Sequence, residues 1–278
     1  MNLSLDIGAT NIRIALVDKT KIKNKIKTPT PLIKKEILEK IIHLISQYKN
    51  YHSICISIAG FEYQGKIQGT LNMDFNNVPL KSMLKNKFSK KIYIQNDARS
   101  AALAELIYGN GKSLNNFVLL TLGTGIGGAI IINKKLYLGN GTAGEVGSMF
   151  IEKNKIFEHL ASGLASVNIA NQIGLKNISV YDIESLAKKG NKKALEVYSK
   201  IGENLGIGLV NLSYALAPEV FIIGGGFSKV NFIYPQTIKT FKEKYTILPT
   251  PKIIKAKFGD DAGLIGASLL PKYKCHST

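Results

Sequence analysis

The chain has 278 residues, 45% of them apolar, which allows one large domain or two medium ones, and it contains no run of about 20 apolar residues that would predict a membrane span. The formal net charge is +18, but apart from Arg13 and Arg99 the basic residues are scattered lysines, which favours a solvated surface over a nucleic-acid partner. The chain has only two cysteines, Cys55 and Cys275, which exclude a disulfide framework. Its N-terminus enters a strand that carries Asp6 and does not resemble a secretory signal. Both observations predict a cytoplasmic protein.

The first half of the chain predicts an opening strand meander followed by alternating helices and strands. Short β-branched runs indicate the strands, and apolar residues at helical spacing indicate the helices. Strands are expected at residues 3–7, 12–17, 22–27, 53–59 and 92–95, with a strand or loop at 64–70. Helices are expected at residues 36–48, 80–88 and 98–108.

The second half repeats this order. A strand pair at residues 117–122 and 129–132 precedes an irregular, glycine-rich insert at 134–158. Further strands are expected at 220–223 and 252–256, and helices at 163–172, 181–188, 192–216, 233–245 and 261–270. The shared order predicts a duplicated α/β domain with a cleft between the copies, one copy comprising residues 1–98 plus 260–278 and the other residues 99–259.

Two glycine-threonine turns, one in each half, are the most informative local feature. Each joins two short apolar strands, at residues 6–11 (DIGATN) and 122–128 (LGTGIGG). Glycine lets the backbone come close to a ligand, threonine adds a hydroxyl donor, and a turn with inward-pointing N–H groups binds anions. We therefore expect the two turns to grip a phosphate chain, and the candidate phosphate-binding residues are Gly8, Thr10, Gly123, Thr124 and Gly125.

Seven motifs in order resemble the ROK family of sugar kinases, repressors and open reading frames. They lie at residues 6–11 (DIGATN), 96–98 (NDA), 123–128 (GTGIGG), 139–147 (GNGTAGEVG), 158–163 (EHLASG), 222–226 (IIGGG) and 261–267 (DAGLIGA). The resemblance covers nearly the whole chain. It implies two actin-like ATPase (ribonuclease H-like) α/β domains closing on ATP and a hexose, and a homodimer.

Phosphoryl transfer to a sugar hydroxyl needs a base, a metal ligand and the exclusion of water. Asp97, at a strand-to-helix junction, is the candidate general base. The alternative is that it only caps the helix, but the two phosphate turns favour the base. Asn96 is expected to hold a sugar hydroxyl, with a turn asparagine as the alternative. Asp6, embedded in an apolar strand, is expected to bind Mg²⁺ directly or through water.

The remaining site residues follow from the resemblance. Glu145 and Glu158 are expected to accept hydrogen bonds from the hexose, and Asn72 is expected near the sugar. The turn at Gly224, Gly225 and Gly226 is expected to let the adenosine lie flat on the backbone, and a plain strand-to-helix turn is its alternative.

The chain departs from the family pattern at the zinc loop. Ser148 stands where many members have histidine, and no cysteine lies between Cys55 and Cys275, so a thiolate zinc site cannot form. His159 is then expected to be structural or solvent-facing.

The leading hypothesis is an ATP-dependent kinase of glucose or a close relative. The alternatives are a sugar-responsive repressor, a sugar-binding pseudoenzyme and an actin-like assembly protein. The first is disfavoured because the phosphate turn begins at Asp6 and leaves no room for a DNA-binding domain. The pseudoenzyme is disfavoured because Asp6, Asp97 and both phosphate turns are intact. The assembly protein is disfavoured because filament formation does not need the sugar-binding carboxylates Glu145 and Glu158 or the Asn96-Asp97 pair.

Overall fold

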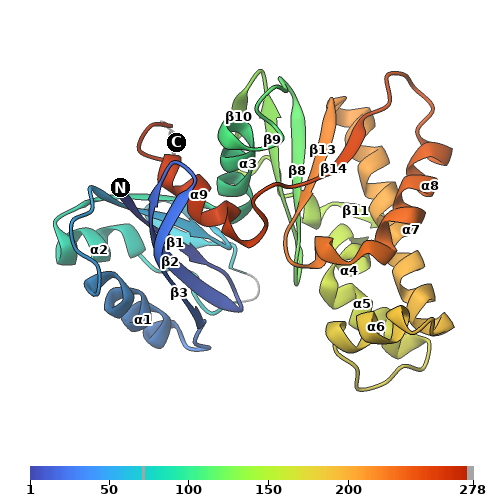
Figure 1. The fold of residues 1–278 in the computed structure, drawn as a ribbon, viewed down its shortest axis with the longest axis horizontal. Helices are drawn as coiled ribbons and strands as arrows, with labels where there is room; N and C mark the ends of the chain where they lie inside the picture. The colour runs from blue at the N-terminus through green and yellow to red at the C-terminus, as the bar shows by residue number, and fades with distance from the viewer. Residues whose placement is uncertain (71–72, 274–278) are drawn as a thin grey trace. The chain divides into compact units, whose positions relative to one another are not determined.

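A computed structural model of the chain describes residues 1–70 and 73–273 (Figure 1). The chain divides into two compact units, Met1–Ser113 with the segment that starts at Asp260, and Leu114–Gly259. The boundary between these compact units falls after Ser113, so the whole helix Asp97–Tyr108 belongs to the first unit. The domain boundary expected after residue 98 stays a prediction. No helix in the described ranges is long and apolar enough to cross a bilayer.

The first unit is built on one five-stranded sheet. Its elements are β1 (Asn2–Ile7), β2 (Asn11–Asp18), β3 (Lys21–Pro29), α1 (Lys34–Ser46), β4 (Ser53–Ile58), β5 (Phe61–Tyr63), β6 (Lys66–Gln68), α2 (Leu80–Phe88), β7 (Lys91–Asn96), α3 (Asp97–Tyr108) and α9 (Ala262–Leu269). The strand order is β3-β2-β1-β4-β7. β1, β2 and β3 pair antiparallel, whereas β1, β4 and β7 pair parallel.

Alternation along the strands gives the first sheet two different faces. Leu3, Leu5 and Ile7 of β1 pack with apolar residues of α1 and α2 in one buried cluster. The intervening positions of β1 are polar, Ser4 and Asp6, and the helix α9 contacts β1, β2 and β4. The first unit therefore has one apolar face under α1 and α2 and one face with polar side chains under α9.

The second unit repeats the same sheet topology. Its elements are β8 (Phe117–Leu122), β9 (Ile126–Ile132), β10 (Lys135–Tyr137), β11 (Phe150–Glu152), β12 (Lys155–Ile156), α4 (Phe157–Ala161), α5 (Gly163–Gln172), α6 (Val180–Lys188), α7 (Lys192–Leu216), β13 (Val220–Gly224), α8 (Tyr234–Lys244) and β14 (Lys252–Lys255). The strand order β10-β9-β8-β13-β14 again joins an antiparallel meander to parallel strands. The predicted duplication of an α/β unit is thus confirmed.

The elements that the sequence did not predict are short. The expected strand or loop at residues 64–70 is part of the hairpin β5–β6, and the irregular insert contains β10, the hairpin β11–β12 and the start of α4. Strands of two or three residues carry too little periodicity to predict, because alternation needs four or more positions to be recognised.

Two helices of the first unit approach each other at a glycine. A Cβ at Gly266 in α9 would stand 1.7 Å from the carbonyl oxygen of Ser100 in α3. Any side chain at this position would force the two helix backbones apart, so the contact between α3 and α9 depends on this glycine.

We expect Gly266→Ala to lower the free energy of unfolding by about 1–3 kcal/mol, the usual cost of overpacking, or more. Urea denaturation would measure it. Ser268→Ala, on the same helix, is the control; its hydroxyl bonds only within the helix, to Ile265, at 2.6 Å, so its loss should cost under about 1 kcal/mol. An unchanged stability of Gly266→Ala would contradict the close helix contact.

Candidate functional site

In the first unit, the candidate residues lie at the carboxyl ends of parallel strands. Asp6 lies near the end of β1, Asn96 is the last residue of β7, and Asp97 is the first residue of α3. Because parallel strands end at the same edge of a sheet, these side chains share the edge at which α/β proteins bind ligands.

Asp6 is held by partners on both neighbouring strands. Its Oδ2 accepts a hydrogen bond from Arg13 Nη1 at 3.0 Å, and its Oδ1 accepts one from Ser57 Oγ at 2.8 Å. Burial raises the pKa of Asp6 above its usual value, whereas the Arg13 charge and the Ser57 hydroxyl oppose that shift. The Asp6 side chain is 13% exposed, so part of it still reaches solvent.

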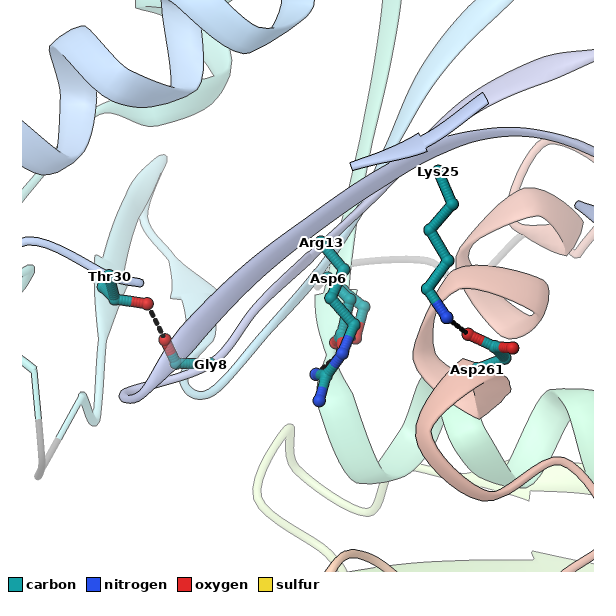
Figure 2. Close-up of polar contacts among 7 residues, drawn as sticks. Asp6, Gly8, Arg13, Lys25, Thr30 and Asp261 are labelled. Carbon is teal, nitrogen blue, oxygen red and sulfur yellow. Dashed lines mark hydrogen bonds and ion pairs between the residues drawn. The ribbon is translucent and has the colours of Figure 1, made fainter. Parts of the chain in front are cut away.

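The first glycine turn is pinned to the end of β3. Gly8 N–H donates to the Asn11 carbonyl at 3.0 Å, and Thr30 Oγ1 donates to the Gly8 carbonyl at 2.6 Å (Figure 2). Thr30 N–H also donates to the Thr10 carbonyl at 3.1 Å, while the Thr10 side chain is exposed. The Gly8 amide is therefore used inside the turn, and a phosphate contact here would fall to the Thr10 hydroxyl and the other amides of the turn.

Asn96 and Asp97 both bond to the start of α3. Asn96 Oδ1 accepts the Arg99 N–H at 3.1 Å and its Nδ2 donates to the Gly60 carbonyl at 3.2 Å. Asp97 Oδ1 accepts the Ala98 N–H at 2.8 Å, and its side chain is partly exposed, whereas Asn96 is buried. The N-cap of α3 is thus Asn96, whereas Asp97 was the residue for which a capping role was considered.

The second glycine turn is fixed by the start of α5. Gly123 N–H donates to the Gly125 carbonyl at 3.0 Å, and the Gly123 carbonyl accepts the Gly163 N–H at 2.8 Å. The Thr124 carbonyl accepts the Leu164 N–H at 3.3 Å, while the Thr124 side chain is exposed. A Cβ at Gly123 would meet nothing within 4 Å, so packing within the described chain does not explain this glycine.

Two more of the predicted residues, Glu158 and Gly225, lie against the second glycine turn. Glu158, on α4, accepts the Ile126 N–H at 3.4 Å, and a Cβ at Gly125 would stand 2.5 Å from its Oε2. A Cβ at Gly225 would stand 2.3 Å from the Leu122 carbonyl oxygen, and Gly225 has a φ of +85°. Gly225 therefore has a structural reason to be glycine, whereas at Gly125 the close atom is the end of the flexible Glu158 side chain.

The other glycines after β13 differ in their surroundings. Gly224 is buried as the last residue of β13, and a Cβ there would come within 3.1 Å of Ala256. Gly226 is exposed, and a Cβ there would have open space around it. Gly226, like Gly123, is thus a position where the backbone lies open to a ligand.

The insert that carries Glu145 is held by packing. A Cβ at Gly147 would stand 2.1 Å from the Ile126 carbonyl oxygen, so the segment after Glu145 lies directly on β9. Phe157 is fully buried against Gly208 of α7. Ser148 and His159 are both exposed. Glu145 itself is exposed at the start of the turn Val146–Ser148.

One predicted site residue is not described by the structure, and three residues near Asp6 were not predicted from the sequence. Asn72 falls outside the described residues, so its expected place near the sugar stays a prediction. Arg13, Ser57 and Gly263 surround Asp6 but were not predicted. Arg13 was within reach, because a tight hairpin at residues 8–11 sets the register that places it opposite Asp6. Ser57 required the pairing of β1 with β4, which no local pattern indicates.

Two α/β units of the same strand order, each with a glycine-threonine turn, define the actin-like ATPase fold of sugar kinases. The chain belongs to the ROK family, whose model matches residues 2–274.

Sugar kinases are among the proteins that this chain resembles. A glucokinase of Streptomyces coelicolor is 29% identical, with 98% of this chain and 98% of that protein covered. An N-acetylmannosamine kinase of Haemophilus influenzae is 26% identical, with 96% and 93% covered. The crystal structure of a ROK family glucokinase from Streptomyces griseus, in complex with glucose and AMPPNP, matches with a TM-score of 0.88 at 27% identity, covering 97% of this chain and 98% of that chain.

The residues present fit a magnesium nucleotide. Mg²⁺ is usually held by one or two carboxylates together with water and substrate phosphates, and the partly exposed Asp6 offers one such carboxylate. Among the described residues, no group of three or more His, Cys, Asp or Glu side chains could hold a metal ion by itself. In the second unit, the backbone at Gly123 and Gly226 has open space beside it.

Two glycine substitutions separate packing from ligand binding. We expect Gly225→Ala to destabilise the fold by about 1–3 kcal/mol, because alanine is strained at that φ. Gly123→Ala should leave stability within about 0.5 kcal/mol of the original but weaken AMPPNP binding about tenfold or more, since the methyl group would occupy ligand space. Thermal unfolding and calorimetric titration would measure both, and tight binding by Gly123→Ala would refute its place beside the nucleotide.

Proposed function

We propose that the chain is a cytoplasmic ATP-dependent hexose kinase that transfers the γ-phosphate to a hydroxyl of glucose, with Asp97 as general base. The observation that carries the proposal is the position of Asp97, partly exposed at the same sheet edge as the Asp6 turn, with Asn96 taking the role of helix cap. The glucokinase relatives support glucose as the acceptor. Dimerisation stays a prediction.

Asp97 would accept the proton of the attacking hydroxyl while the oxygen forms its bond to the γ-phosphorus and ADP leaves. Such a base contributes about 10²–10⁴-fold. Its Oδ1 already accepts the Ala98 N–H, which keeps the carboxylate in one orientation at the start of α3. Bound Mg²⁺ would neutralise the charge of the phosphates, and Asp6 would hold it.

The sugar would be held by amide and carboxylate groups. Glu145 and Glu158 would accept hydrogen bonds from ring hydroxyls, and Asn96 has one amide N–H and one carbonyl lone pair left after its two bonds. The turns at Gly8–Thr10 and Gly123–Gly125 would contact the phosphates, and the adenosine would lie on Gly224–Gly226.

A coupled assay of ADP release across glucose, mannose, fructose, N-acetylglucosamine and N-acetylmannosamine tests the acceptor. We expect magnesium-dependent turnover, with the highest kcat/KM on glucose. A preference for N-acetylmannosamine would retain the kinase and correct the sugar. The absence of turnover on all five sugars, with sugar binding intact, would favour a regulator or a pseudoenzyme.

Replacing the base tests its role. We expect Asp97→Asn to lower kcat about 10²–10⁴-fold while sugar binding is kept, because the amide retains the acceptor for Ala98 N–H but cannot take a proton. Asp182→Asn is the matched control, since Asp182 also lies in a first helical turn and accepts a backbone N–H, from Ser179 at 2.9 Å. Turnover by Asp97→Asn at the level of this control would remove Asp97 from the mechanism.

A further inference from the structure

A row of polar side chains crosses the whole first sheet at one level. Each member of this row lies directly opposite the next on the neighbouring strand. In sheet order the members are Lys27 on β3, Arg13 on β2, Asp6 on β1, Ser57 on β4 and Gln95 on β7. Residues that lie directly opposite on neighbouring strands present their side chains to the same face. Asp6 is the central member of this row.

The Asp6 carboxylate is enclosed on three sides. Arg13 bonds one oxygen and Ser57 bonds the other, as Figure 2 shows for Arg13. From the third side, a Cβ at Gly263 of α9 would stand 2.4 Å from Asp6 Oδ1. Two hydrogen bonds to different oxygens, together with this contact, leave the carboxylate a single orientation.

We propose that Ser57 and Arg13 are positioning residues that fix the Asp6 carboxylate in the orientation that binds the magnesium ion of the nucleotide. This inference rests on the proposed function, because it takes Asp6 as the metal ligand. Ser57 is fully buried, so it acts on a ligand only through Asp6. Groups that bond to a metal-binding carboxylate commonly change metal affinity 10–100-fold when removed.

The composition of the chain gives Arg13 separate support. Among 37 basic residues only Arg13 and Arg99 are arginine. A lysine at position 13 would supply a charge but not the rigid, planar set of donors that fixes a carboxylate. An arginine beside Asp6, in a chain that uses lysine at nearly every other basic position, indicates that geometry matters there as well as charge.

The same strand offers a matched control. Ser53 is also a buried serine of β4, and its Oγ also donates to a side-chain oxygen on β1, that of Asn2, at 2.9 Å. Ser57→Ala and Ser53→Ala therefore each remove one hydroxyl and one hydrogen bond between the same two strands. A purely structural role of Ser57 predicts that neither substitution changes the advantage that Mg²⁺ gives to nucleotide binding.

The experiment measures AMPPNP binding by calorimetry, with Mg²⁺ and with EDTA, for both serine variants. We expect Ser57→Ala to bind Mg·AMPPNP about tenfold more weakly than Ser53→Ala, and the two to bind AMPPNP equally in EDTA. Thermal unfolding of both variants should show that each remains folded at the temperature of the titration, so that the comparison reports binding. Equal affinities with Mg²⁺, or no advantage of Mg²⁺ in the unaltered protein, would overturn the proposal.

Arg13 provides a second test that does not depend on a buried site. Arg13→Met should weaken Mg·AMPPNP binding about tenfold, and Arg13→Lys should restore only part of it. Lys27→Met, which removes the charge next to Arg13 in the same row, is the control and should bind as the unaltered protein does. Full binding by Arg13→Met would remove Arg13 from the proposal. Because no sugar is present, these results stand apart from the assays of turnover.

Discussion

The first unit depends on one constraint, which is that the Asp6 carboxylate lies on the sheet face that α9 covers. Removing a charge from water is costly unless hydrogen bonds and an opposite charge compensate, so Asp6 needs partners wherever the fold places it. The sheet order supplies them, because β1 lies between β2 and β4 and its register puts Arg13 and Ser57 on either side. The same order brings the ends of β1, β4 and β7 to one edge, where Asp97 follows.

The duplicated units use one topology to support their turns in different ways. In the first unit, the turn is hydrogen-bonded to Thr30 at the end of β3, and it lies next to the row of polar side chains that contains Asp6. In the second unit, backbone groups at the start of α5 hold the turn, and Gly225 packs behind it. A shared strand order therefore sets where the turns lie, while the side chains around each turn decide its chemistry.

Long, regular elements were predictable from the sequence, and contacts between strands were not. The helices at residues 80–88 and 192–216 and the strand at 117–122 match the structure because apolar periodicity marks them locally. α4, which carries Glu158, has five residues and was missed for lack of such a pattern. The pairing of Ser57 with Asp6 joins residues 51 positions apart, and only the sheet order creates it.

Close backbone packing gives the glycine-rich insert an order that does not depend on a metal. Gly128 and Gly147 allow the chain around Glu145 to lie against β9, since a Cβ at Gly128 would stand 2.6 Å from the Gly144 carbonyl oxygen. Phe157 then fixes α4, and with it Glu158, to α7 through Gly208. The two glutamates thus take their positions from the sheet and from the longest helix of the second unit. Because interiors are densely packed, an added methyl group at either β9 contact would displace Glu145 along with its backbone.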